Sequence, residues 1–146
     1  MPIPPRVSVV ALRTLDLARS TAFYTALGWE LSAASTPAMS LFKTVGSLLL
    51  VCTDELLAEL GGEEVAVALA GEPNGEAVLS HPCRHRRGGR RRDPGGGRGR
   101  RGGRQAARQH ALGGSYAFFA DPDGHLWEVI HHPLYQLGAD GRPQIP

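Results

Sequence analysis

The sequence predicts an α+β fold of paired βαβββ modules, the second of which is incomplete. Residues 7–28 join an apolar strand pattern to an amphipathic helix pattern, and residues 29–52 add three short strand patterns. Residues 113–133 (GGSYAFFADPDGHLWEVIHHP) contain the most specific hairpin signal of the chain. The length of 146 residues suits a single domain that buries a real core.

The first module is expected at residues 6–53. It begins with a buried strand at residues 7–13, after which Asp16 is a candidate helix N-cap and Gly28 stands in the C-cap position. The strand candidates that follow are residues 29–33, 40–44 and 47–52, the last two joined by a tight turn at Val45-Gly46. The apolar residues at helical spacing between Asp16 and Gly28 are Leu17, Phe23, Tyr24 and Leu27.

Residues 54–75 read as a connector. Asp54 is expected to cap a short helix that ends at Gly61-Gly62, and residues 64–70 fit either a strand or part of the connector. This organisation leaves residues 76–133 for the second module.

The second module should start with a strand at residues 76–81 and end with the hairpin. In that hairpin Pro122 and Asp123 suit the centre of a type I turn, and Gly124 supplies the positive φ of a bulge residue. Residues 134–146 form a tail.

An Arg/Gly-rich stretch, residues 83–108, interrupts the second module where a helix and a strand are expected. Between Arg84 and Arg108 lie 11 of the 16 basic residues and one of the 14 acidic residues, so this stretch carries a net charge of +10 and the remainder −8. It contains no Val, Ile, Leu, Met or Lys, and alone it would bury nothing.

Three explanations of this stretch are open: nucleic-acid binding through phosphates, a solvated linker, or coding sequence read out of frame. Arg, Gly, Pro and Ala have the codons richest in G and C, and Lys does not. The frame error is therefore favoured, and nucleic acid is not expected as a partner.

Composition indicates a globular protein without a membrane partner. Hydrophobic residues make up 42% of the chain, and no apolar run approaches the roughly 18 residues of a membrane span. The Pro-rich start lacks the apolar core of a secretory signal, so a cytoplasmic location is expected. Cys52 and Cys83 form neither a disulfide framework nor a CxxC zinc motif.

Glu128 is the acidic residue whose position calls for an explanation. Period-two alternation places it with Leu126 and Ile130 on one face of a strand and His131 on the other. A carboxylate buried among apolar neighbours needs a partner, a metal ion or a raised pKa, whereas one at a solvated strand end needs none. Both interpretations remain open from the sequence.

Two blocks carry a resemblance to a known family. The first is Leu15 to Ser20 with Phe23-Tyr24 and Leu27-Gly28, and the second is residues 119–128 (FADPDGHLWE). Together they resemble the vicinal oxygen chelate superfamily, which includes glyoxalases, ring-cleaving dioxygenases and bleomycin-resistance-type binding proteins. The tail is similar to the ending of small bacterial members.

The resemblance implies curved mixed sheets that form a cleft, and a homodimer. In metal-dependent members the ligands come from the first and last strands of the modules. The matching positions are Glu128 on the last strand, Glu76 on the first strand of the second module, and Val9 on the first strand of the chain. Valine cannot bind a metal, so a divalent metal would be held by Glu128, Glu76 and waters, with His81 or His131 contributing in a different strand register.

The sequence therefore favours a small-molecule binding protein without a complete metal site and without a cofactor. Phe42, Tyr116 and Phe118 are the expected cleft-lining residues. The alternatives are a metal-dependent lyase or dioxygenase that uses Glu128, and nucleic-acid contact through the Arg-rich stretch. No P-loop, dinucleotide fingerprint or Ser/His/Asp arrangement supports another enzyme class.

Overall fold

The computed structural model describes residues 7–69, 78–83, 108–109, 114–133 and 136–144. The chain divides into two units, Met1–Gly71 and Glu72–Pro146. Expectations for Glu76 and for residues 84–107 of the Arg-rich stretch lie outside the described residues. Within the described residues, no helix is long and apolar enough to cross a membrane.

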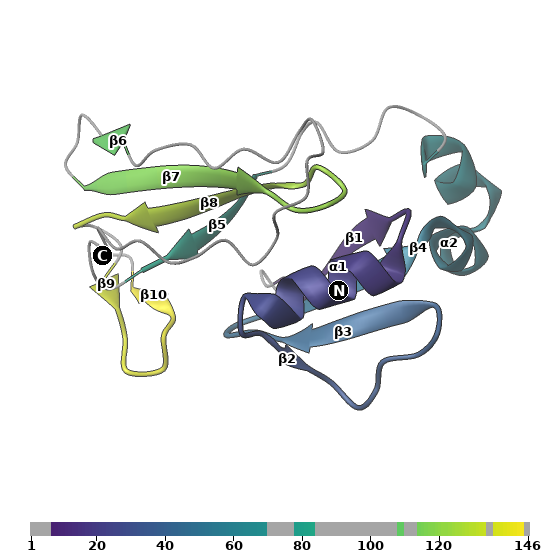
Figure 1. Ribbon diagram of the computed structural model, residues 1–146, viewed down its shortest axis with the longest axis horizontal. Helices are drawn as coiled ribbons and strands as arrows, with labels where there is room; N and C mark the ends of the chain where they lie inside the picture. Colours follow the sequence, from purple (N-terminus) through teal and green to yellow (C-terminus); the bar gives the residue numbers. More distant parts are fainter. Residues whose placement is uncertain (1–6, 70–77, 84–107, 110–113, 134–135, 145–146) are drawn as a thin grey trace, which may run out of the picture. The chain divides into compact units, whose positions relative to one another are not determined.

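The first unit has the predicted βαβββ order (Figure 1). Its four-stranded sheet has the order β1-β4-β3-β2, with β1 parallel to β4 and the other pairs antiparallel. The elements are β1 (Val9–Thr14), α1 (Leu17–Ala26), β2 (Glu30–Leu31), β3 (Met39–Lys43) and β4 (Leu48–Thr53).

Local signals fix the ends of α1, as the sequence predicts. The Asp16 side chain accepts a hydrogen bond from Arg19 N at 2.9 Å, which satisfies an N–H group that the first helical turn leaves without a partner. At the other end Gly28 has a φ of 88°, a value that favours glycine. The helix therefore ends here, and the chain continues into β2 of the sheet.

The core of the first unit lies between α1 and one face of its sheet. Tyr24 and Phe42 are both fully buried, with ring centroids 5.5 Å apart, and Trp29 stacks on Tyr24. Hydroxyl pairs fasten the helix to the strands, with Ser20 Oγ 3.0 Å from Thr14 Oγ1. Fully burying one such aromatic side chain stabilises the fold by about 2–3 kcal/mol, so these rings are a main source of the unit's stability.

The helix α2 (Asp54–Leu69) differs from the predicted connector in two ways. Gly62, with φ 71° and ψ −166°, interrupts the helix near the predicted stop, but residues 64–69 then continue as helix, so the strand alternative there is wrong. The capping side chain is Thr53, whose Oγ1 accepts from Leu56 N at 3.4 Å. Asp54 instead forms an ion pair with Arg13 at 2.6 Å, which ties the start of α2 to β1.

The second unit repeats the strand order of the first. Its sheet has the order β5-β8-β7-β6, with β5 parallel to β8 and the other pairs antiparallel. A strand is present at the end of the Arg/Gly-rich stretch, where that stretch was expected to replace one, and it is β6, two residues long. The elements are β5 (Val78–Pro82), β6 (Arg108–Gln109), β7 (Ser115–Ala120) and β8 (Leu126–His131), followed by β9 (Gln136–Leu137) and β10 (Pro143–Gln144).

The turn between β7 and β8 is organised by Asp121. Its Oδ1 accepts from Asp123 N at 3.0 Å and from His125 N at 2.8 Å, and its Oδ2 lies 2.8 Å from His125 Nδ1. Asp121 and His125 are both buried, and Gly124 has a φ of 92°. The predicted turn is therefore confirmed, with Asp121 as its hydrogen-bonding centre.

Candidate functional site

One row of side chains crosses the second sheet and brings a carboxylate, a hydroxyl and an aromatic ring together. Ser80 on β5 and Phe118 on β7 are the register partners of Glu128 on β8, one on each side. Residues paired in this way point to the same face of a sheet. The Ser80 hydroxyl donates to Glu128 Oε2 at 2.7 Å, so the serine orients the carboxylate.

Aromatic and aliphatic side chains surround this row on the same face, which we name the Glu128 face. Tyr116, two residues before Phe118, meets it edge to face with centroids 5.6 Å apart and an interplanar angle of 73°. Leu126 and Ile130 flank Glu128 along β8. The structure thus brings together Glu128, Tyr116 and Phe118, three of the residues singled out from the sequence.

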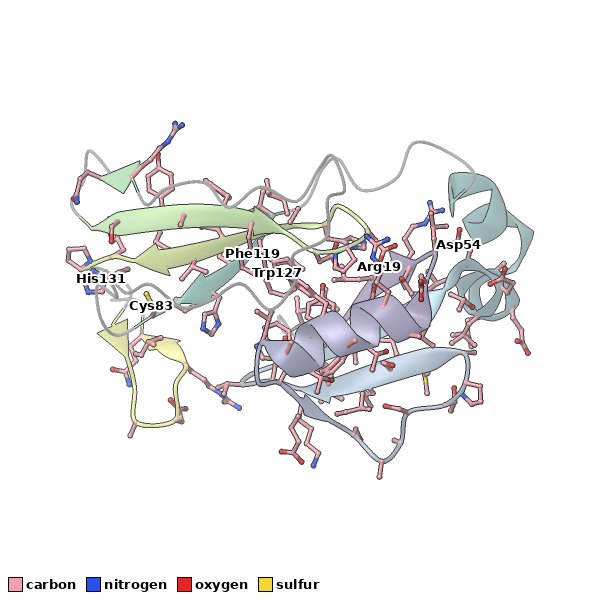
Figure 2. All side chains as sticks on the ribbon, viewed as in Figure 1. Arg19, Asp54, Cys83, Phe119, Trp127 and His131 are labelled. Carbon is pink, nitrogen blue, oxygen red and sulfur yellow. The ribbon has the colours of Figure 1, made fainter. Side chains whose placement is uncertain are left out.

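The two predicted histidines lie on the opposite face of the same sheet. His81 follows Ser80 and is the partner of Val129, and His131 is the partner of Ser115, so neither shares a face with Glu128. His131 Nδ1 is buried without a hydrogen-bond partner in the described residues. Figure 2 labels His131 and Cys83 at the same end of this sheet, and Cys83 N donates to Ile130 O at 2.8 Å.

That opposite face also carries large aromatic side chains. Phe119 and Trp127 stack there with centroids 6.2 Å apart and planes only 8° from parallel (Figure 2). Trp127 is buried, whereas Leu126 on the Glu128 face is 38% exposed. The two faces of the sheet therefore differ in character, and the Glu128 face is the more open one.

The corresponding row of the first sheet contains no polar side chain. The last strand pair before the hairpin turn is Lys43 with Leu48 in the first sheet and Ala120 with Leu126 in the second. The pair two residues further from the turn is Leu41 with Leu50 in the first sheet and Phe118 with Glu128 in the second. The partner of Leu50 on β1 is Ala11, which corresponds to Ser80. Val9 lies on the same face as Ala11 and is 48% exposed.

Phe42 occupies a different environment from the one expected. It lies on the face of the first sheet that packs on α1, where it contacts Tyr24 and is fully buried. Its position is that of a core residue, because period-two alternation directs it toward the helix. The expectation that Phe42 lines a cleft therefore requires correction.

The metal ligands proposed from the sequence do not gather around Glu128 in the described part of the chain. His81 points to the other face, and the strand position beside Glu128 holds Ser80. No group of three or more His, Cys, Asp or Glu residues among the described residues is arranged to hold a metal ion. The described residues therefore do not fit a metal held by three protein ligands, the usual minimum at a catalytic site.

Ser80 and Asp121 are the residues that the sequence reasoning missed. Ser80 lies 48 positions from Glu128, and only the parallel register of β5 and β8 makes them neighbours. Asp121 had a visible signal, because an aspartate that opens a turn commonly accepts hydrogen bonds from the backbone two residues later.

Comparisons with known proteins agree with this architecture. Residues 6–44 match the family model described as "Bleomycin resistance protein-like N-terminal". Comparison with curated proteins gives no significant match.

Three solved structures share the fold. A glyoxalase-related enzyme from Fulvimarina pelagi is 24% identical, with 97% of this chain and 98% of that chain covered and a TM-score of 0.71. A glyoxalase/bleomycin resistance protein/dioxygenase from Nocardioides is 24% identical, with coverage of 94% and 93% and a TM-score of 0.65. A bleomycin-binding protein complexed with bleomycin is 16% identical, with coverage of 87% and 98% and a TM-score of 0.53. The chain therefore has the fold of the glyoxalase/bleomycin resistance/dioxygenase superfamily, and its first module carries the sequence signature of the bleomycin resistance protein-like N-terminal family.

Proposed function

We propose that this protein binds a small organic molecule on the Glu128 face, without a metal ion held by its own side chains. The observation that carries the proposal is the row of Ser80, Glu128 and Phe118, in which an oriented carboxylate lies beside an aromatic ring. Ligand sites typically combine apolar and aromatic walls with a few fixed polar groups. Tyr116 extends the aromatic wall in this case.

Binding requires less of this chain than metal catalysis does. A catalytic metal of the zinc type is held by three protein groups and leaves a position open for water or substrate. Beside Glu128 the neighbouring strand contributes a serine, which is not a usual metal ligand. The bleomycin-binding protein, which has the same fold, is an example of its use to hold a small molecule.

A ligand screen with paired variants tests this function. Compounds that raise the melting temperature of the wild type are titrated by calorimetry, because a ligand that binds only the folded state stabilises it. Tyr116→Ala should weaken binding about fivefold, since stacking on an aromatic wall contributes on the order of 1 kcal/mol. His81→Ala, an exposed change on the opposite face of the same sheet, should leave affinity within twofold. Equal losses in both variants, or no stabilising compound, would reject the proposal.

The second candidate function is a metal-dependent lyase or dioxygenase in which Glu128 is a metal ligand. It is favoured by Glu128 Oε1, which has no hydrogen-bond donor among the described residues. A tightly bound metal in the purified protein, present at one ion per chain and lost in Glu128→Ala, would support this candidate over metal-free binding.

We also propose that two copies of the chain associate. The support is the first sheet, whose face opposite α1 carries the exposed apolar side chains of Val9 and Leu48. A second copy would remove them from water.

A further inference from the structure

We infer that the ligand of the Glu128 face carries a cationic nitrogen, an inference that rests on the binding function proposed above. Among the described residues this face carries one acidic and one basic side chain. Glu128 is its acidic residue, and no ion pair reaches Glu128 within the described part of the chain. Arg108 is the basic residue in register with this face, opposite Tyr116, and it forms no ion pair with Glu128.

The hydrogen bonding of Glu128 leaves one oxygen available. Ser80 occupies Oε2, and Oε1 has no donor among the described residues. Glu128 is partly exposed and its bond to Ser80 lies in an exposed position, so a ligand can reach Oε1 directly from solvent. A ligand N–H that carries a positive charge would supply the missing donor in a charge-assisted bond, which is roughly twice as strong as a neutral one.

The aromatic rings favour the same kind of ligand. The faces of aromatic rings carry negative potential and attract cations within about 6 Å of the ring centroid. Tyr116 and Phe118 are inclined at 73° to each other, so their surfaces form two walls at nearly a right angle. Such a corner beside a carboxylate is suited to an ammonium group, because the carboxylate and both ring faces attract a positive charge.

Matched pairs of compounds test the inference. A panel of aromatic amines that starts with phenethylamine is titrated by calorimetry beside the N-acetylated neutral form of each amine. The wild type should bind at least one amine ten or more times more tightly than its neutral form, a difference of about 1.4 kcal/mol. Glu128→Gln should reduce the ratio to about two. Glu59→Gln, the same change on an exposed carboxylate of α2, should leave the ratio unchanged.

The possible outcomes separate this inference from the function beneath it. Equal affinities within each pair, or a preference for neutral compounds, overturn the cationic ligand and leave small-molecule binding intact. Failure of every compound in the panel, when the broader screen does find ligands, also overturns it. Failure of both screens rejects the binding function as well. Should Glu128→Gln not fold, Ser80→Ala replaces it, with an expected reduction of the ratio to about three because the carboxylate remains but loses its orienting donor.

Discussion

Replacing Asp121 with alanine should destabilise the second module more than its place in a turn sequence would suggest. The carboxylate accepts from two backbone N–H groups and pairs with the His125 ring, all at 2.8–3.0 Å. Each hydrogen bond to a charged group contributes about 1.5 kcal/mol or more, and His125 would keep a buried N–H without a partner. We expect the free energy of unfolding to fall by roughly 3–5 kcal/mol, or about 10 °C in melting temperature.

Urea titration followed by circular dichroism measures the loss, and a matched variant gives it scale. Asp140 makes the same kind of turn bond, to Arg142 N at 3.0 Å, but at an exposed site. Asp140→Ala should therefore cost below about 1 kcal/mol. A double-mutant cycle with His125→Ala should give a coupling energy of at least about 1 kcal/mol. Similar losses for Asp121→Ala and Asp140→Ala, or no coupling to His125, would refute the reasoning.

Four further predictions follow from the same structure. Phe42→Leu should lower the free energy of unfolding by about 1 kcal/mol and leave ligand affinity unchanged. Phe118→Leu should lower ligand affinity, measured by calorimetry, and leave the free energy of unfolding nearly unchanged. In a Cys83→Ser background the Cys52 thiol should resist Ellman's reagent until the protein unfolds, because burial, with a smaller effect of the Asp54 carboxylate, raises its pKa. As the pH rises, the Cys52 thiol loses its proton in the unfolded chain before it does so in the folded chain. The free energy of unfolding should therefore decline above about pH 8.5, detectable as a lower urea midpoint. Elemental analysis should find no stoichiometric Zn, Mn, Fe or Ni, and one tightly bound ion would contradict this. Sedimentation should find a dimer, and a monomer at all concentrations would contradict the proposed association.

Elements with local signals were predictable from the sequence. The helix α1 has an N-cap, a regular apolar stripe and a glycine stop within residues 16–28, and each agrees with the others. The β7–β8 hairpin was equally accessible, because its turn residues are adjacent in the chain. Local agreement of this kind needs no knowledge of the rest of the fold.

Features that depend on long-range pairing were not predictable. Phe42 follows Leu41, and in a run where neighbouring residues are both apolar, alternation alone does not tell which face the helix covers. Ser80 became the partner of Glu128 only through a parallel pair with no turn to set its register. In α2 the positive φ of Gly62 interrupts the helix as its sequence indicates, but the chain resumes helix afterwards.

The shared strand order of the two sheets has a consequence for evolution and for stoichiometry. In an assembly of two identical modules every substitution would appear twice, so a carboxylate in the row of one sheet would have a copy in the row of the other. Two modules encoded in one chain are free of this constraint, and the row of Ala11, Leu50 and Leu41 does differ from that of Ser80, Glu128 and Phe118. Of these two rows in the described residues only one carries a carboxylate, so the proposed binding function predicts saturation at one ligand per chain.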